Sequence, residues 1–313
     1  MRRVLALLLA LLALSACGAE GPGEDVPPEE MRAVSEERDT PPAGSDPKPE
    51  HPDTALPELK AVEPLSAPAL VTEGRAPAED YRLPPSVDAD PDRLWENYQD
   101  WAYSGNITGL LAEVPEADAA FYGLPLPVSG REPGRALIRW GDSLAEFDWR
   151  DGLPRMVRPQ LYCFDADRDQ QEELVIISHA GGGTGISIEE LHVIEKGPDG
   201  TLTDYQFPRS LWQEQMSEPM SAAALEGQTF AILGEELVWF DTGDVDMDLE
   251  TACTGSIANF SAEDWGDIQF HGAFCLSPVG NPVPWYVAET SASIEYQDGV
   301  FTLCNFHLHS YNQ

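Results

Sequence analysis

The hydrophobic pattern of the chain changes twice along its length. It starts with an unbroken run of Leu, Ala and Val from Val4 to Leu14, preceded by Arg2 and Arg3. These eleven residues are too few for a membrane-spanning helix, which needs about 20, but their length and basic flank are typical of a signal peptide. The pattern therefore predicts an exported chain whose residues 1–17 form the signal peptide.

The next stretch, residues 18–92, has almost no hydrophobic periodicity. Pro, Glu, Asp, Ala and Ser dominate it, and Tyr81 is its only aromatic residue. Such a polar segment buries too little apolar surface to offset the entropy of ordering it, and Pro-rich, charged chains are extended. We therefore predict a long disordered linker over residues 18–92 and a globular domain over residues 93–313.

Hydrophobic periodicity returns at the start of this domain. Leu94, Tyr98 and Trp101 stand at i, i+4 and i+7, which predicts an amphipathic helix with Asp92 at its N-cap. Farther along, short apolar or alternating runs are separated by Gly, Asp and Pro, as in strands and tight turns. The expected strands are 136–140, 144–149, 174–179, 186–195, 229–233, 237–241, 268–275, 292–296 and 301–309, with a short helix near 211–216.

Two dipeptides indicate how neighbouring strands connect. Gly141-Asp142 and Asp298-Gly299 each separate two apolar runs, which predicts β-hairpins. Together, the expected strands, hairpins and helices predict a mainly β fold of antiparallel strands with a few helices. A propeller-like arrangement and a sandwich both agree with this pattern.

The charge of the domain limits its partners. From Leu94 to the C-terminus there are 36 Asp and Glu against 9 Lys and Arg, and the whole chain has a formal net charge of −37. Such a surface repels phosphate backbones, so we expect no nucleic-acid partner.

The strongest chemical candidate is an acidic loop that leads into the apolar strand at 174–179. Its oxygen-bearing residues are spaced two apart and are Asp165, Asp167, Asp169, Gln171 and Glu173. The carboxylates at positions 1, 3, 5 and 9 and a backbone carbonyl at position 7 suit one calcium ion. Position 6 of such loops is usually Gly, and here it is Gln170. The alternative is a solvated acidic turn that binds no ion.

Two parts of the chain resemble known families. The residues Leu14-Ser15-Ala16-Cys17 resemble the bacterial lipobox, which implies that Cys17 is diacylated, becomes the mature N-terminus and anchors the chain stably at the outer side of the cell membrane. The alternative is an ordinary secretory signal that contains a Cys. The loop pattern is similar to the calcium loops of FG-GAP and VCBS repeats, and the run 165–195 resembles an uncharacterised lipoprotein family of clostridia and their relatives.

The globular domain contains four cysteines, at Cys163, Cys253, Cys275 and Cys304. An even number in an exported domain suggests disulfides, and three pairings are open. Free thiols are the alternative. The chain has no C-x-x-C spacing, which argues against a zinc or redox motif.

Three weaker features do not indicate a site. The glycine-rich run Ala180–Gly185 lacks the Lys-Ser/Thr ending of a phosphate loop and is interpreted as a tight β connection. The pair His307 and His309 is a weak transition-metal signal. The second acidic run, Asp244–Glu250, is interpreted as a solvated loop.

The leading hypothesis is therefore a lipid-anchored extracytoplasmic protein with a binding or structural domain, stabilised by calcium. An envelope protein or a glycan is the expected ligand. The first alternative is an envelope hydrolase whose carboxylates, such as Glu189, Glu263 and Asp264, meet only on folding. The second is an accessory or sensory component of a membrane system.

Overall fold

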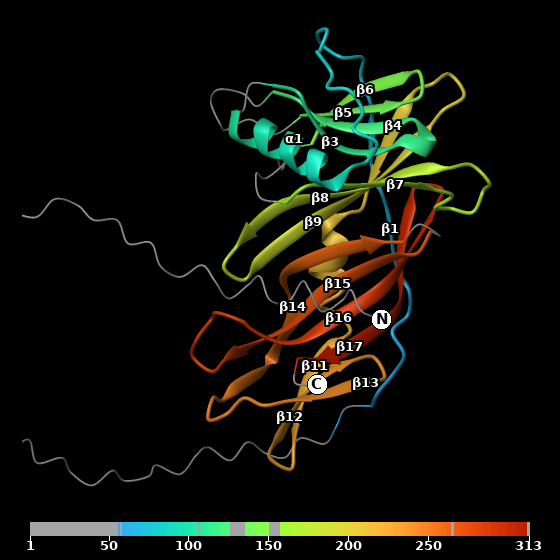
Figure 1. Ribbon diagram of the computed structural model, residues 1–313. Helices are drawn as coiled ribbons and strands as arrows, with labels where there is room; N and C mark the ends of the chain where they lie inside the picture. The colour runs from blue at the N-terminus through green and yellow to red at the C-terminus, as the bar shows by residue number, and fades with distance from the viewer. Residues whose placement is uncertain are drawn as a thin grey trace, which may run out of the picture. The chain divides into compact units, whose positions relative to one another are not determined.

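A computed structural model describes residues 56, 58–104, 107–125, 135–149, 157–263 and 266–311 (Figure 1). The predicted signal peptide, the predicted lipobox with Cys17 and the first part of the predicted linker lie outside these residues. The described residues belong to one compact unit, His51–Gln313. They are mostly in β-strands that pair almost entirely antiparallel, which confirms the predicted fold class.

The largest of three sheets has ten strands. Along its main path the order is β1 (Leu65–Pro68), β17 (Val300–Ser310), β16 (Trp285–Gln297), β15 (Ile268–Pro278), β14 (Met247–Ala262), β9 (Ile186–Lys196), β10 (Leu202–Gln206) and β2 (Leu70–Glu73). Off this path, β8 (Glu173–Gly183) pairs with both β9 and β7 (Gln160–Phe164). Only β14 and β9 pair in parallel among these described strands.

The ten-stranded sheet closes on itself through its N-terminal segment. Strands β1 and β2 stand at the two ends of the order, yet Ala69 alone separates them in the chain. The N–H of Ala69 donates to the carbonyl of Gly299 at 2.8 Å, in the β16–β17 turn. This single segment, Leu65–Glu73, thus covers the edge of β17 and the edge of β10 (Figure 1). We call it the closing segment.

The two smaller sheets are formed by strands consecutive in sequence. The four-stranded sheet contains β3 (Gly109–Val114), β4 (Ala119–Gly123), β5 (Arg135–Trp140) and β6 (Ser143–Asp148), with the short helix η2 (Pro115–Ala117) between β3 and β4. Helix α1 (Pro91–Ser104) packs on this sheet (Figure 1). The three-stranded sheet contains β11 (Met220–Leu225), β12 (Gln228–Leu233) and β13 (Glu236–Phe240), preceded by the helical turn η3 (Leu211–Gln215).

Strand β8 lies between two hydrophobic cores. Its side chains alternate across the strand, so Val175 and Ile177 enter the larger core, with η3 and strands β14–β17. Leu174 and Ile176 enter a second core, with α1 and the four-stranded sheet. Burial on both faces explains why the sequence here is a continuous apolar run instead of an alternating one.

Helix α1 confirms the predicted aromatic face and corrects the predicted cap. Leu94, Tyr98 and Trp101 are all buried, and the indole N–H of Trp101 donates to a backbone carbonyl at 2.9 Å. The cap is Asp90, not Asp92, because a carboxylate oxygen of Asp90 accepts the backbone N–H of Asp92 at 3.0 Å. Pro91 then occupies the first helical position, where its missing N–H has no cost.

The hairpin predictions hold and one loop prediction does not. Strands β5–β6 and β16–β17 pair in register around Gly141-Asp142 and Asp298-Gly299. The glycine-rich run is a β connection, since β8 continues to Gly183 and β9 starts at Ile186. The second acidic run is loop only in its first half, because β14 begins at Met247.

The predicted linker is too long at its C-terminal end. Residues 65–90 belong to the folded unit, because β1 and β2 pair within the large sheet and Val87 is buried in a small core beside α1. A buried carboxylate holds the last part of this stretch: Glu113, in β3, accepts the backbone N–H groups of Val87 and Ala89 at 2.9 and 2.8 Å.

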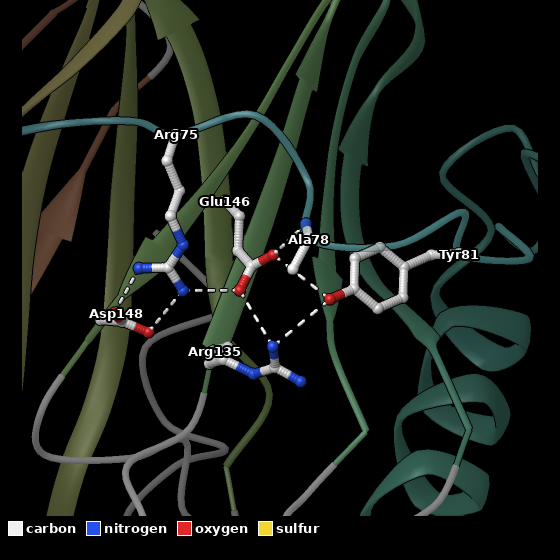
Figure 2. Close-up of polar contacts among 6 residues, drawn as sticks. All are labelled: Arg75, Ala78, Tyr81, Arg135, Glu146 and Asp148. Atoms are coloured by element: carbon white, nitrogen blue, oxygen red, sulfur yellow. Dashed lines mark hydrogen bonds and ion pairs between the residues drawn. The ribbon is translucent and has the colours of Figure 1, made fainter.

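A second buried carboxylate, Glu146 in β6, holds the middle of this stretch (Figure 2). Its side chain is fully buried and accepts a hydrogen bond from Arg75 at 2.7 Å and from Arg135 at 3.0 Å. Its other oxygen accepts the N–H of Ala78 and the hydroxyl of Tyr81, each at 3.2 Å. Every lone-pair direction of this carboxylate thus has a donor, and three of the four come from the segment predicted to be disordered.

Candidate functional site

The acidic loop connects β7 to β8 in an antiparallel hairpin in which Phe164 pairs with Glu173. Arg168 and Gln170 have φ values of 64° and 77°, in the left-handed region. Gln170 thus adopts the left-handed conformation that Gly usually supplies at position 6 of a calcium loop. The turn forms without Gly, at a cost of about 1–2 kcal/mol of backbone strain.

Three of the five predicted ligands come together in this loop. Asp165, Asp167 and Glu173 each contribute one carboxylate oxygen to a cluster in which all three oxygens lie within 4.8 Å of one another. Glu173 is 4% exposed, and it accepts the N–H of Ala166 at 2.7 Å. One oxygen of Asp165, Oδ2, accepts the N–H of Gln170 at 3.0 Å. The other, Oδ1, is buried without a hydrogen-bond partner.

The remaining two predicted ligands lie at the exposed side of the loop. The backbone N–H and side-chain amide of Gln171 donate to Asp169 at 2.7 and 2.8 Å. The N–H of Asp169 in turn donates to Asp167 at 3.0 Å. Asp169 therefore orders the turn and holds Asp167 in place.

Burial and mutual repulsion of the loop carboxylates raise the pKa values of two of them. Burial, followed by repulsion from neighbouring Asp side chains, raises the pKa of Glu173 to about 7, although the N–H of Ala166 opposes the shift. Burial also raises the pKa of Asp167, and the charges of Asp169 and Asp165 add to the effect. A cation would remove this repulsion.

The loop also borders an acidic cavity of about 300 Å³. Besides loop residues, the cavity is lined by Glu195, Lys196, Tyr205 and Asp298. Glu195 comes from β9, Tyr205 from β10 and Asp298 from the β16–β17 turn, so the cavity lies where the closing segment joins the two sheet edges. Sequence reasoning missed these residues because no local spacing marks them.

A second polar cluster, also missed, is buried between the sheets. His192 is fully buried, stacks on Trp149 with ring centroids 4.1 Å apart, and lies 3.0 Å from Asp204. Trp149 donates its indole N–H to Asp204 at 2.9 Å. Burial lowers the pKa of His192, but Asp204 and Glu190 outweigh it and raise the pKa to about 9. His192 and Asp204 belong to β9 and β10, and Trp149 directly follows β6, so the cluster joins these three strands. The only sequence signal for the cluster was a His within an apolar strand.

The other predicted candidates have structural partners. His307 contacts Glu236 at 2.8 Å, and His309 contacts Ser291 at 3.1 Å. Glu189 accepts the N–H of Phe260 at 2.7 Å, where β14 diverges from β9. The other two residues of the hydrolase hypothesis are Glu263, which is exposed, and Asp264, which lies outside the described residues. The cysteines Cys163, Cys253, Cys275 and Cys304 are all free thiols in the structure.

Comparisons of the chain with protein-family models, curated proteins and solved structures found no match. Neither α1 nor any other helix in the described part of the chain has the length and hydropathy of a membrane span.

Proposed function

We propose that the β7–β8 loop binds one calcium ion and that the domain is a lipid-anchored, extracytoplasmic binding or structural module. One observation carries the calcium proposal: Asp165, Asp167 and Glu173 bring one carboxylate oxygen each within 4.8 Å of one another, in a loop where Asp165 Oδ1 is buried without a hydrogen-bond partner. A buried carboxylate oxygen without a donor is costly, and a cation bound to Asp165 would satisfy it.

The donor set fits calcium in type. Three carboxylates offer hard oxygen ligands, which calcium prefers over the nitrogen and sulfur ligands typical of zinc. Calcium accepts six to eight oxygens in flexible geometry, so waters and backbone carbonyls complete its shell. Three acidic ligands with an exposed side correspond to a weak site, and we expect a Kd on the order of 10⁻⁴–10⁻³ M, as in extracellular modules.

The ion would act as a brace for the fold. Glu173 is the first residue of β8, the strand whose two faces enter the two cores. Asp167 lines the acidic cavity, which lies where the closing segment joins the two sheet edges. Fixing these two carboxylates to one ion would hold the loop against the start of β8. It would also neutralise part of the negative charge of the acidic cavity.

Calcium binding is expected to raise the melting temperature of the mature chain. A ligand that binds only the folded state at about 100 times its Kd adds about 2.7 kcal/mol, which corresponds to about 5–10 °C for a domain of this size. The comparison is thermal unfolding in excess calcium and in chelator for the wild type, Asp165→Asn and Asp167→Asn. The rise is expected in the wild type only.

The matched control is Asp244→Asn, an exposed carboxylate of the second acidic run, which should keep the full rise. An equal rise in all four chains would mean that calcium acts on the general negative charge. The absence of any rise would leave the loop as an acidic turn that binds no ion.

The lipid anchor rests on the apolar run and on the residues Leu14-Ser15-Ala16-Cys17. Expressed in a bacterium, the wild-type chain is expected to partition into the detergent phase of a two-phase extraction, because two or three acyl chains anchor stably. Cys17→Ala should move to the aqueous phase. If Cys17→Ala stays in the detergent phase, the anchor is not on this residue.

A further inference from the structure

Two of the four domain cysteines face each other across a pair of strands. In the antiparallel register of β14 and β15, Cys253 stands directly opposite Cys275. Opposite residues in such a ladder have Cα atoms about 4.5–5.5 Å apart and share one face of the sheet. A disulfide requires Cα atoms about 4.4–6.8 Å apart, so the backbone already has the spacing of a bridge.

The surroundings leave room for sulfur at this position. Gly255 follows two residues after Cys253, and a Cβ atom at this glycine would lie 2.4 Å from the Sγ of Cys275. The same Cβ would lie 2.5 Å from the ring of Tyr286. Only a residue without a side chain fits beside this thiol. Burial raises the pKa of Cys275 to about 12, and the thiol of Cys253 on the facing strand adds to the shift.

The other two cysteines have different neighbours. Cys163, in β7, pairs with Leu174, and its thiol lies 3.7 Å from a carboxylate oxygen of Glu172. Cys304, in β17, pairs with Ser293. The strand register therefore supports a single bridge between Cys253 and Cys275, since neither Cys163 nor Cys304 stands opposite another cysteine.

The position of the pair gives a crosslink a clear structural effect. The β14–β15 ladder changes register on both sides of it, between residues 248 and 253 and again between residues 254 and 258 of β14. Between these irregularities the ladder keeps only two pairs, Cys253–Cys275 and Thr254–Phe274. Bulged segments lose ladder hydrogen bonds, so a covalent bond here would fix an irregular part of the β14–β15 ladder.

We propose that Cys253 and Cys275 form a disulfide when the chain meets a disulfide donor, such as oxidised glutathione or a thiol–disulfide oxidoreductase. The thiolate of Cys253, the less buried of the two, attacks a sulfur of the donor and releases one donor thiolate. The thiolate of Cys275 then attacks the Cys253 sulfur of this mixed disulfide and releases the second donor thiolate. The two cysteine protons end on the two donor thiolates, so the donor is reduced as the bridge forms.

Burial makes this bridge structural and not a rapidly exchanging switch. Thiolates, and not thiols, carry out the exchange, and burial raises the pKa of both cysteines above the usual range. We therefore expect the bond to form slowly in the folded chain and to resist mild reductants once formed.

The test is peptide mapping of the mature chain after incubation with oxidised glutathione and alkylation of the remaining thiols, without reduction. A Glu-specific protease cuts after Glu250, Glu263 and Glu289, which places the two cysteines on separate peptides, 251–263 and 264–289. We expect these peptides to be recovered as one linked species that separates on reduction. Cys163 and Cys304 are expected to be alkylated.

Thermal unfolding gives a second, independent readout. A bridge that closes this loop is expected to raise the melting temperature by roughly 5–15 °C relative to the reduced chain. Cys253→Ser should lose the increase, whereas the matched variant Cys304→Ser should keep it. Full alkylation of peptides 251–263 and 264–289 after oxidation, or linkage of either one to Cys163 or Cys304, would overturn the proposal. Neither result bears on the calcium site or on the lipid anchor.

Discussion

A chain that begins at Pro91 is expected to lose cooperative unfolding, whereas a chain that begins at Leu56 is expected to unfold in one transition. The shorter chain retains α1 and all later strands but lacks the closing segment, so the edges of β17 and β10 are open. It also leaves Glu113 and Glu146 buried without their main-chain donors. Open edges promote association between chains, and uncompensated buried carboxylates destabilise the fold strongly.

A third chain, beginning at Gly74, separates these two effects. It lacks β1 and β2 but keeps the residues that contact Glu113 and Glu146. Denaturant unfolding and sedimentation should show a folded, less stable and self-associating protein. If the chain from Pro91 is as stable and monomeric as the chain from Leu56, then residues 56–90 do not belong to the folding unit.

Replacing Glu146 by Ala is expected to destabilise the folded unit by about 1–3 kcal/mol, the usual effect of leaving a buried hydrogen-bond partner unsatisfied. The variant removes the carboxylate that pairs with Arg75 and Arg135 and leaves the N–H of Ala78 without an acceptor, at a position where the Glu146 side chain is fully buried. Denaturant unfolding measures the difference. The matched control is Asp148→Asn, because Asp148 contacts Arg75 from an exposed position, where ion pairs contribute at most about 1 kcal/mol.

The effect of Glu146 has a definite pH dependence. Burial acts to raise the pKa of Glu146, but the hydrogen bonds from Arg75 and Ala78 outweigh it, so the pKa is below the ordinary value of 4.5. Its contribution is therefore complete above the unfolded-state pKa and is lost as the pH falls through the folded-state pKa. The stability gap between wild type and Glu146→Gln should narrow in acid. A gap that is constant from neutral pH to acid would contradict an ionised, paired Glu146.

Local patterns predicted those parts of the fold that depend on neighbours in sequence. The face of Leu94, Tyr98 and Trp101, the two hairpin turns and the doubly buried strand β8 all have short-range signals, and the structure contains each of them. The closing segment has no such signal, because its residues are only partly buried or exposed and its partners lie far along the chain. Composition alone assigned it to the linker.

The residues of the candidate site could be predicted only where they lie within the loop itself. The two-residue spacing of Asp165 and Asp167 and the start of β8 at Glu173 follow from the loop itself. Glu195 and Asp298 join the site only because the large sheet closes. The buried roles of Glu113 and Glu146 were missed because a Glu within a strand is usually solvent-exposed.

Closure of the large sheet by its earliest strand sets an order of events during synthesis. Ser66 and Thr302, 236 residues apart, share a hydrogen bond of 2.8 Å between β1 and β17. Among the described strands β1 is made first, and it therefore cannot reach its place until β17, the last of them, has followed. Pairings of such long range make folding slow, whereas α1 and the β3–β6 sheet contain only local connections. The nascent chain can thus form one small sheet early, while its largest sheet stays open until β17 has been synthesised.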